Sequence, residues 1–122
     1  MALPIESRIR DLLSEFLARS GGDVTGVVLS RGDGLPVAYV LPTGDPKLVS
    51  AMWALAAGSL KRLGEELKIG SSRYAILTYE HKNLIVYRVK DLYLLALANP
   101  NANLGLILLE MERLQTKISE II

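Results

Sequence analysis

Residues 47–68 read KLVSAMWALAAGSLKRLGEELK, and this stretch decides the architecture of the chain. Asp45 can cap a helix that begins here, Pro46 suits the first turn of that helix, and Gly70 ends it. On a helical wheel the larger apolar side chains fill one arc of about 160°, which is wide enough to cover a sheet. The arc contains Leu48, Val49, Met52, Trp53, Leu55, Leu60, Leu63 and Leu67.

The opposite side of this helix consists of small residues, and no charge occurs between residues 48 and 60. A helix that is apolar nearly all round is buried nearly all round, and one sheet covers only one side. A second copy of the chain would cover the other side, because small residues let two helices approach closely. An exposed alanine-rich face is the competing interpretation, since alanine is the best helix former. The predicted contact residues are Lys47, Ser50, Ala51, Ala54, Ala57, Gly58 and Lys61.

The remaining segments predict one antiparallel sheet and two more helices. Apolar residues recur at three- and four-residue spacing over residues 3–19 and 104–121, which is typical of amphipathic helices. Asp33-Gly34 is a tight hairpin turn, and Pro36 places the strand after it at a sheet edge. The expected strands are 24–30, 35–41, 73–79, 84–89 and 92–98. The order αββαβββα indicates an α/β (α+β) fold, with helices on both faces of a single five-stranded sheet.

The strand expected at residues 73–79 has no clearly polar face, no proline and no charge in its middle. At a sheet edge, such a strand would invite pairing with another chain. An inner strand fits the pattern equally well. The residues expected to join a second copy, if the strand is an edge, are Arg73, Tyr74, Ala75, Ile76, Leu77, Thr78 and Tyr79.

The composition excludes several classes of function. The chain has 122 residues with 14 Lys and Arg, 13 Asp and Glu, and a net charge of +1, whereas nucleic-acid binders carry a strong basic excess. It has no cysteine, and the single His81 excludes a site that needs two imidazoles. No segment resembles a signal peptide or an uninterrupted membrane span. We therefore expect a cytoplasmic protein that neither inserts into a membrane nor binds nucleic acid.

No residue pattern predicts a catalytic, cofactor-binding or metal-binding site. Residues 32–34, Gly-Asp-Gly, lack the Lys-Ser/Thr and the following helix of a phosphate-binding loop. His81 falls in a predicted turn, where an exposed histidine is expected. Arg31, Arg62 and Arg73 could each act as an arginine finger toward a bound GTPase, or could be solvated charges.

Three stretches, taken in order and spacing, resemble the Roadblock family, the dynein light chain Roadblock-type domains. The first is the hairpin GVVLSRGDGLPVA at residues 26–38. The second is the alanine-rich helix ending LKRLG at residues 60–64, and the third is NANLGLILLE at residues 101–110. The resemblance covers essentially the whole chain, so residues 1–122 are expected to form a single Roadblock-type domain.

The resemblance implies a sheet ordered 2-1-5-4-3, which places strand 73–79 at an edge. It also implies a homodimer in which the second helices pair antiparallel and the third strands join into one sheet. Many members, including the MglB-like regulators of bacteria and archaea, bind or regulate Ras-like small GTPases. The resemblance brings no catalytic residue with it.

Three functions are therefore in competition. The first is a non-catalytic homodimer that regulates or scaffolds a small Ras-like GTPase. The second is an adaptor or structural light chain without a GTPase partner. The third is a small-molecule sensor or enzyme, which needs a pocket with convergent polar groups, and no sequence motif points to one.

Overall fold

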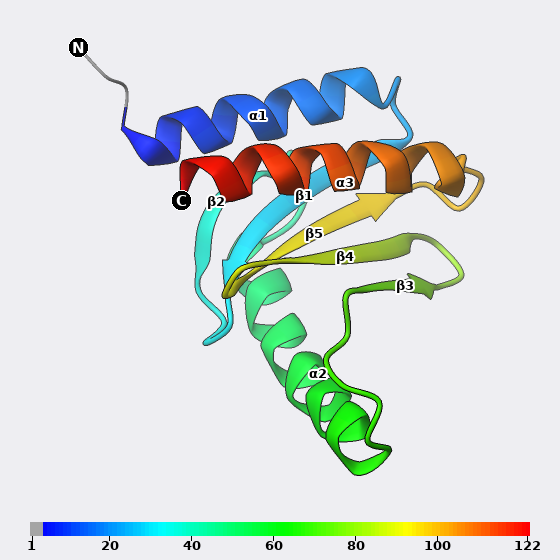
Figure 1. Ribbon diagram of the computed structural model, residues 1–122. Coiled ribbons are helices and arrows are strands. Elements are labelled where there is room, and N and C mark those ends of the chain that lie inside the picture. The colour runs from blue at the N-terminus through cyan, green and yellow to red at the C-terminus, as the bar shows by residue number, and fades with distance from the viewer. Residues whose placement is uncertain (1–3) are drawn as a thin grey trace.

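The computed structural model describes residues 4–122 as one antiparallel sheet with helices on both faces (Figure 1). The predicted element order and sheet type are confirmed. The elements are α1 (Ile5–Arg19), β1 (Val24–Arg31), β2 (Pro36–Val40), α2 (Pro46–Glu66), β3 (Tyr74–Thr78), β4 (Asn83–Val89), β5 (Leu92–Ala98) and α3 (Leu104–Ile121).

The strand order is β2-β1-β5-β4-β3, as the family resemblance implied. Strands β1 and β5 form the centre, with Val28 opposite Leu95 and Leu29 opposite Leu94. Strand β2, with Pro36, lies at one edge, and β3 lies at the other. The β1–β2 turn uses Gly34 at a φ of 92°, a left-handed conformation in which glycine carries no steric cost.

The larger core lies between the sheet and the pair α1 and α3, which run side by side over one face (Figure 1). Alternate residues of a strand point to opposite faces, so Val27 and Leu29 enter this core while Val28 between them faces away. The fully buried side chains of this core include Ile9, Leu13, Leu29, Ile85, Leu94, Met111 and Ile118.

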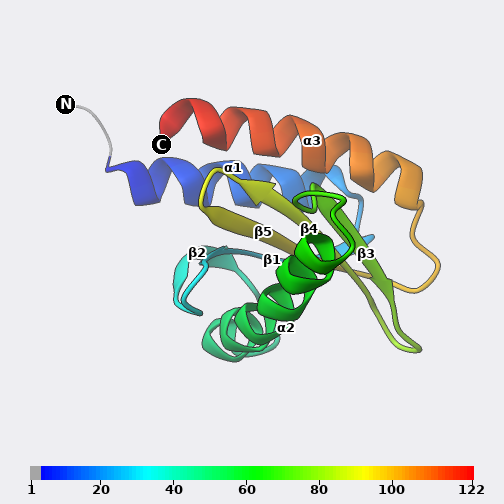
Figure 2. The same cartoon turned by 60° about the horizontal axis from the view of Figure 1, so that its bottom comes forward.

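The smaller core lies on the opposite face, where α2 packs on the sheet (Figure 2). Its centre consists of Trp53 and the strand residues Val28, Val86 and Leu95. The Trp53 ring meets the ring of Tyr93 edge to face, with the two centroids 5.7 Å apart. This edge-to-face contact stabilises the packing of α2 on the sheet.

The way α2 faces the sheet corrects one sequence-based expectation. The arc of larger apolar residues was expected to cover the sheet, yet most of it faces away. Five of its members are between 51% and 71% exposed, namely Leu48, Met52, Leu55, Leu63 and Leu67. Only Trp53, Val49 and Leu60 of that arc contact the smaller core.

Small residues explain this orientation. Ser50 and Gly64 are buried and Ala57 is half-buried. These residues follow one another at intervals of seven positions along α2. Because Ser50 and Ala57 have short side chains, the helix backbone comes close enough to the sheet for Trp53 to reach the second core, while Gly64 packs against the carbonyl group of Gly70. The larger arc is thereby turned outward.

Element ends differ from the predicted ones by one or two residues. Leu3, included in the first predicted helix, lies outside the described residues. Arg73 and Tyr79, predicted as strand, lie just outside β3. Strand β4 begins one residue earlier than expected, at Asn83.

The end of α2 gives a test of close packing. A Cβ added at Gly64 would overlap the carbonyl oxygen of Gly70, which is backbone and cannot turn aside. Gly64→Ala is expected to destabilise the protein by about 1–3 kcal/mol, although alanine favours helix. Urea unfolding followed by circular dichroism measures this change.

The matched control is Gly105→Ala, in the first turn of α3. Its added Cβ would lie 3.5 Å from the nearest atom, Asn103 Oδ1, which is an ordinary contact. This variant should be unchanged or more stable by at most about 1 kcal/mol. Equal stability of the Gly64→Ala protein and the wild type would contradict the packing described for α2.

Candidate functional site

The outward side of α2 carries an apolar surface, which we call the α2 outer face: Leu48, Ala51, Met52, Leu55, Gly58, Ser59 and Leu63. All seven residues are exposed, and Leu55 at 71% is the most exposed of the large ones. Charged residues are absent from this set. An almost continuous apolar strip along the helix is therefore exposed to solvent. A strip of this kind marks an interaction site.

The helix that bears this surface begins at a defined point. Pro46 occupies the first turn, where its missing N–H costs nothing, and the Asp45 carboxylate accepts a hydrogen bond of 2.9 Å from the Lys47 N–H. The next turn brings the Ser50 side chain under the helix and Leu48 outward. The cap therefore fixes where α2 begins.

The edge of β3 forms a second unpaired surface, at the end of the sheet opposite β2 (Figure 2). Strand β3 pairs with β4 on one side, with Ile76 opposite Ile85, and no other strand of residues 4–122 pairs with its free side. Tyr74 is 51% exposed and Tyr79 65% exposed at the two ends of this edge. A bare strand with exposed aromatic residues is a template for pairing with another chain.

The β1–β2 turn supports the first half of α2. A Cβ built on Gly34 would lie 3.3 Å from the Ala51 Cα and 3.5 Å from the Ala54 Cβ. The buried turn thus approaches one flank of the helix, and Ala54 is half-buried there. Alanine at these two positions lets the hairpin approach.

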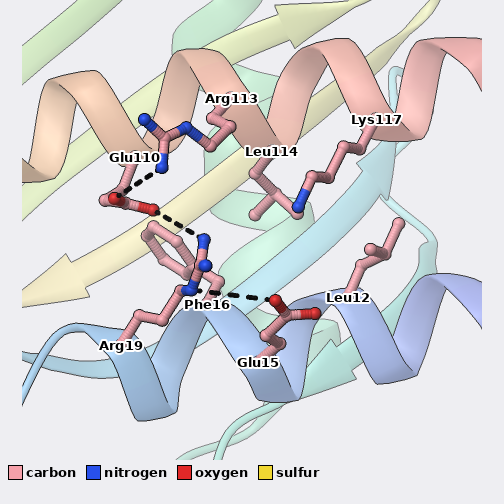
Figure 3. A pocket seen from close by; sticks show the side chains of 8 residues that line it. All are labelled: Leu12, Glu15, Phe16, Arg19, Glu110, Arg113, Leu114 and Lys117. Carbon is pink, nitrogen blue, oxygen red and sulfur yellow. Dashed lines mark hydrogen bonds and ion pairs between the residues drawn. The ribbon is translucent and has the colours of Figure 1, made fainter.

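The groove between α1 and α3, by contrast, is closed (Figure 3). Arg19 reaches across it to Glu110 at 3.8 Å and also pairs with Glu15 at 3.7 Å. Glu110 pairs in turn with Arg113 at 3.4 Å. The remaining space is about 20 Å³, which is too small for a ligand.

The residues considered for chemistry remain apart from one another. His81 is exposed in the β3–β4 turn, and Arg31 pairs with Asp33 within the β1–β2 turn. Within residues 4–122, no group of three or more His, Asp or Glu side chains could hold a metal ion. No helix of the same residues is long and apolar enough to cross a bilayer.

Comparison with known proteins identifies the family. Residues 10–99 match the Roadblock/LC7 domain, which is most of the chain. The chain belongs to the Roadblock/LC7 family. Across 115 residues it is 33% identical to the uncharacterized protein MJ0714 of Methanocaldococcus jannaschii, and the match covers 93% of this chain and 96% of that protein.

Solved structures of this Roadblock/LC7 fold superimpose closely. Myxococcus xanthus MglB matches with a TM-score of 0.89 at 14% identity, over 99% of this chain and 92% of that one. The Roadblock/LC7 domain from Streptomyces avermitilis has a TM-score of 0.72 at 25% identity, over 89% and 92%. Acanthamoeba castellanii profilin IB shares the fold with a TM-score of 0.67 at 13% identity, over 91% and 96%.

The predicted dimer residues occupy several places in this Roadblock/LC7 domain. Lys47, Ala51, Gly58 and Lys61 are exposed on α2, and the residues of 73–79 lie along the β3 edge. Ser50 is fully buried by its own chain, and its hydroxyl has no hydrogen-bond partner in residues 4–122. Ala57 is half-buried in the smaller core. Ser50 is therefore unavailable to a second chain in this conformation.

Sequence reasoning missed Leu48, Met52, Leu55 and Leu63 as surface residues. A signal for them was present, because Ser50, Trp53, Ala57, Leu60 and Gly64 alternate at three- and four-residue spacing and form a second stripe of small and large residues. That stripe fits a close contact with a flat sheet better than a stripe of leucines does.

Tyr87 links the β3 edge to the larger core. Its ring stacks on that of Tyr74, with centroids 5.1 Å apart and planes 11° from parallel. Burial raises the pKa of Tyr87 above its ordinary value of 10.0, Glu112 and Tyr74 act in the same direction, and Arg73 opposes them. The phenol is therefore held in its protonated form.

The raised pKa predicts how stability depends on pH. Above pH 10.0 the unfolded chain loses the Tyr87 proton more readily than the folded chain does, so this residue lowers stability as pH rises. Tyr87→Phe should therefore lose less stability than the wild type between about pH 9 and pH 11. Urea unfolding of both proteins across this range measures the difference.

At neutral pH the two proteins should be similar in stability, because the Tyr87 hydroxyl makes only a long hydrogen bond of 3.5 Å to the Leu108 carbonyl. Tyr39→Phe, an exposed tyrosine on β2, is the control and should follow the wild type. Parallel pH curves for Tyr87→Phe and the wild type would contradict the prediction.

Proposed function

We propose that this protein is a cytoplasmic, non-catalytic homodimer that binds and regulates, or scaffolds, a small Ras-like GTPase. In this proposal residues 1–122 act as a single Roadblock-type domain. Two observations carry it together: the α2 outer face, which is a strip of exposed apolar side chains, and the free edge of β3.

A second copy is the occupant that fits both surfaces. The α2 outer face is apolar and has small residues, Ala51 and Gly58, within it, so that two copies related by a twofold axis could pack closely. Burying an exposed leucine or methionine contributes about 1.5–3 kcal/mol. In the proposed dimer the two β3 edges also meet, and each supplies the hydrogen-bonding groups that the other lacks.

Support for self-association also comes from a related structure. One MglB structure, which matches with a TM-score of 0.88 at 19% identity, is described as having a tetrameric arrangement. The Roadblock family resemblance implies dimers built from the second helix and the third strand. Both surfaces are unpaired in the chain described here.

A GTPase partner is favoured by the family and by the fold. Members of the Roadblock family commonly bind Ras-like GTPases, and the MglB structures share nearly the full length of this chain. A dimer presents two copies of each surface around its axis, which suits a binding platform. No side chain of this domain acts on nucleotide in the proposal.

The alternative is an adaptor or light-chain-like module that dimerises without a GTPase partner. The same two surfaces support it, because dimerisation does not depend on what the dimer holds. Affinity capture dominated by filament, motor or membrane-complex subunits, with no GTPase in any nucleotide state, would favour this alternative.

Leu55→Glu tests the homodimer. It places a charge on the most exposed large residue of α2, where a second copy would have to desolvate it, so the variant should sediment as a monomer. Leu55 is a better choice than Ala54, because Ala54 also lies beside its own β1–β2 turn.

The control is Leu109→Glu, on α3 across the sheet, where the leucine is 52% exposed. This variant should keep the wild-type sedimentation coefficient. The homodimer proposal fails if wild-type protein sediments as a monomer, or if Leu55→Glu remains a dimer at all concentrations tested.

GTPase binding is tested with purified Ras-like GTPases of the same genome. Each is loaded with GDP or with a non-hydrolysable GTP analogue and mixed with the protein, and co-elution and phosphate release are measured. We expect one GTPase to co-elute preferentially in one nucleotide state, and Leu55→Glu to weaken this binding. Absence of binding in every nucleotide state would contradict the GTPase assignment and leave the homodimer intact.

A further inference from the structure

A cleft separate from the α2 outer face lies where the segment before β3, the end of β4 and α3 meet. Its volume is about 460 Å³, the largest among the described cavities and within the usual range for small-molecule sites. Arg73 and Arg88 contribute from the strand side, Lys90 from the β4–β5 turn, and Gln115 from α3. We call it the basic cleft.

The charges of the basic cleft are unbalanced. Arg73, Arg88 and Lys90 line it together with a single carboxylate, Glu112. None of these four side chains forms an ion pair with an Asp, Glu, Lys or Arg side chain within the part of the chain that the structure describes, although four other such pairs occur there. Like charges gathered in one cavity repel each other, and a bound anion offsets that repulsion.

Two of the cations are positioned by hydrogen bonds to the backbone. Arg88 Nε donates to the Lys90 carbonyl at 3.1 Å, which leaves both terminal NH₂ groups of the guanidinium without a partner among residues 4–122. Lys90 Nζ donates to the Ile122 carbonyl at 2.7 Å and has two further donor hydrogens. Both side chains therefore keep donor groups for a ligand, and a guanidinium fork matches the oxygens of a phosphate.

The hydrogen-bond acceptors and hydroxyl groups of the cleft narrow the class of ligand further. Gln115 Nε2 donates to the Arg88 carbonyl, so its Oε1 remains free to accept. Glu112 is also an acceptor, and a carboxylate beside an anion is tolerated when the ligand brings hydroxyl groups to it. Ser71 and Ser72 add hydroxyls at the rim.

We propose that the basic cleft binds a phosphate monoester that also carries hydroxyl groups, with Arg88 and Lys90 holding the phosphate. Glu112 and Gln115 accept hydrogen bonds from the ligand's hydroxyls. A soluble sugar phosphate and the phosphorylated inositol headgroup of a lipid share this chemistry. The proposal does not rest on the GTPase. Arg88 and Lys90, which hold the phosphate, lie outside the predicted dimer residues, whereas Arg73 and Tyr74 at the side of the cleft belong to them.

Isothermal titration of the full chain with ribose 5-phosphate, ribose and inorganic phosphate tests the site. We expect saturable binding of ribose 5-phosphate, weaker binding of inorganic phosphate and none of ribose, with affinity falling as salt rises. Arg88→Gln should weaken ribose 5-phosphate binding by about tenfold or more, because a charged hydrogen-bond donor is lost. Arg10→Gln, an exposed cation on α1, should bind like the wild type.

Lys90→Gln is the second variant, and it carries the test if thermal unfolding shows that Arg88→Gln is not folded. Co-sedimentation with phosphatidylcholine vesicles, with and without phosphatidylinositol phosphate, forms a separate arm. Binding to the phosphorylated vesicles alone would support the site and assign it to a lipid headgroup. The proposal is overturned if neither ribose 5-phosphate nor these vesicles bind, or if Arg10→Gln weakens binding as much as the cleft variants do.

Discussion

The contact of α2 with the sheet is the constraint on which the rest of this structure depends. Trp53 fills the smaller core against Val28, Val86 and Leu95, and short residues on either side of it let the helix come close. Because only this narrow stripe faces inward, the larger apolar side chains of α2 face the solvent. The surface proposed for self-association is therefore a direct result of how the helix packs on its own chain.

Helices cover the two faces of the sheet to different extents. On one face, α1 and α3 together cover the strands, and the Arg19–Glu110 pair spans the groove between them. On the other face α2 is the only helix, and residues near the β3 edge such as Ala75 and Leu77 are only half-buried. The unpaired surfaces described above all belong to this incompletely covered side or to the β3 edge itself.

Much of the fold could be predicted from the sequence because its signals are local. The Asp33-Gly34 turn, the Asp45-Pro46 helix start and the alternating strands each depend on residues that are close together in the chain. The family resemblance added the strand order, which local patterns do not contain. The orientation of α2 was predicted wrongly, because the wheel ranks side chains by size while close packing on a flat sheet favours short ones such as Ser50 and Ala57.

The candidate sites were predictable to a smaller extent. An unpaired β3 edge follows from the composition of 73–79 once the strand order is known. The basic cleft could not be predicted, because Arg73, Arg88, Lys90 and Gln115 come from separate segments that only the folded chain brings together.

The connection from α2 to β3 has a mechanical consequence. It spans residues 67–73 and is tied back to the helix by the bond from the Ile69 N–H to the Gly64 carbonyl, 3.0 Å long, with Lys68 in a left-handed conformation at a φ of 56°. So short and tethered a link leaves little slack. The start of β3 is therefore held close to the last turn of α2, so the position of this edge strand depends on the position of the helix end.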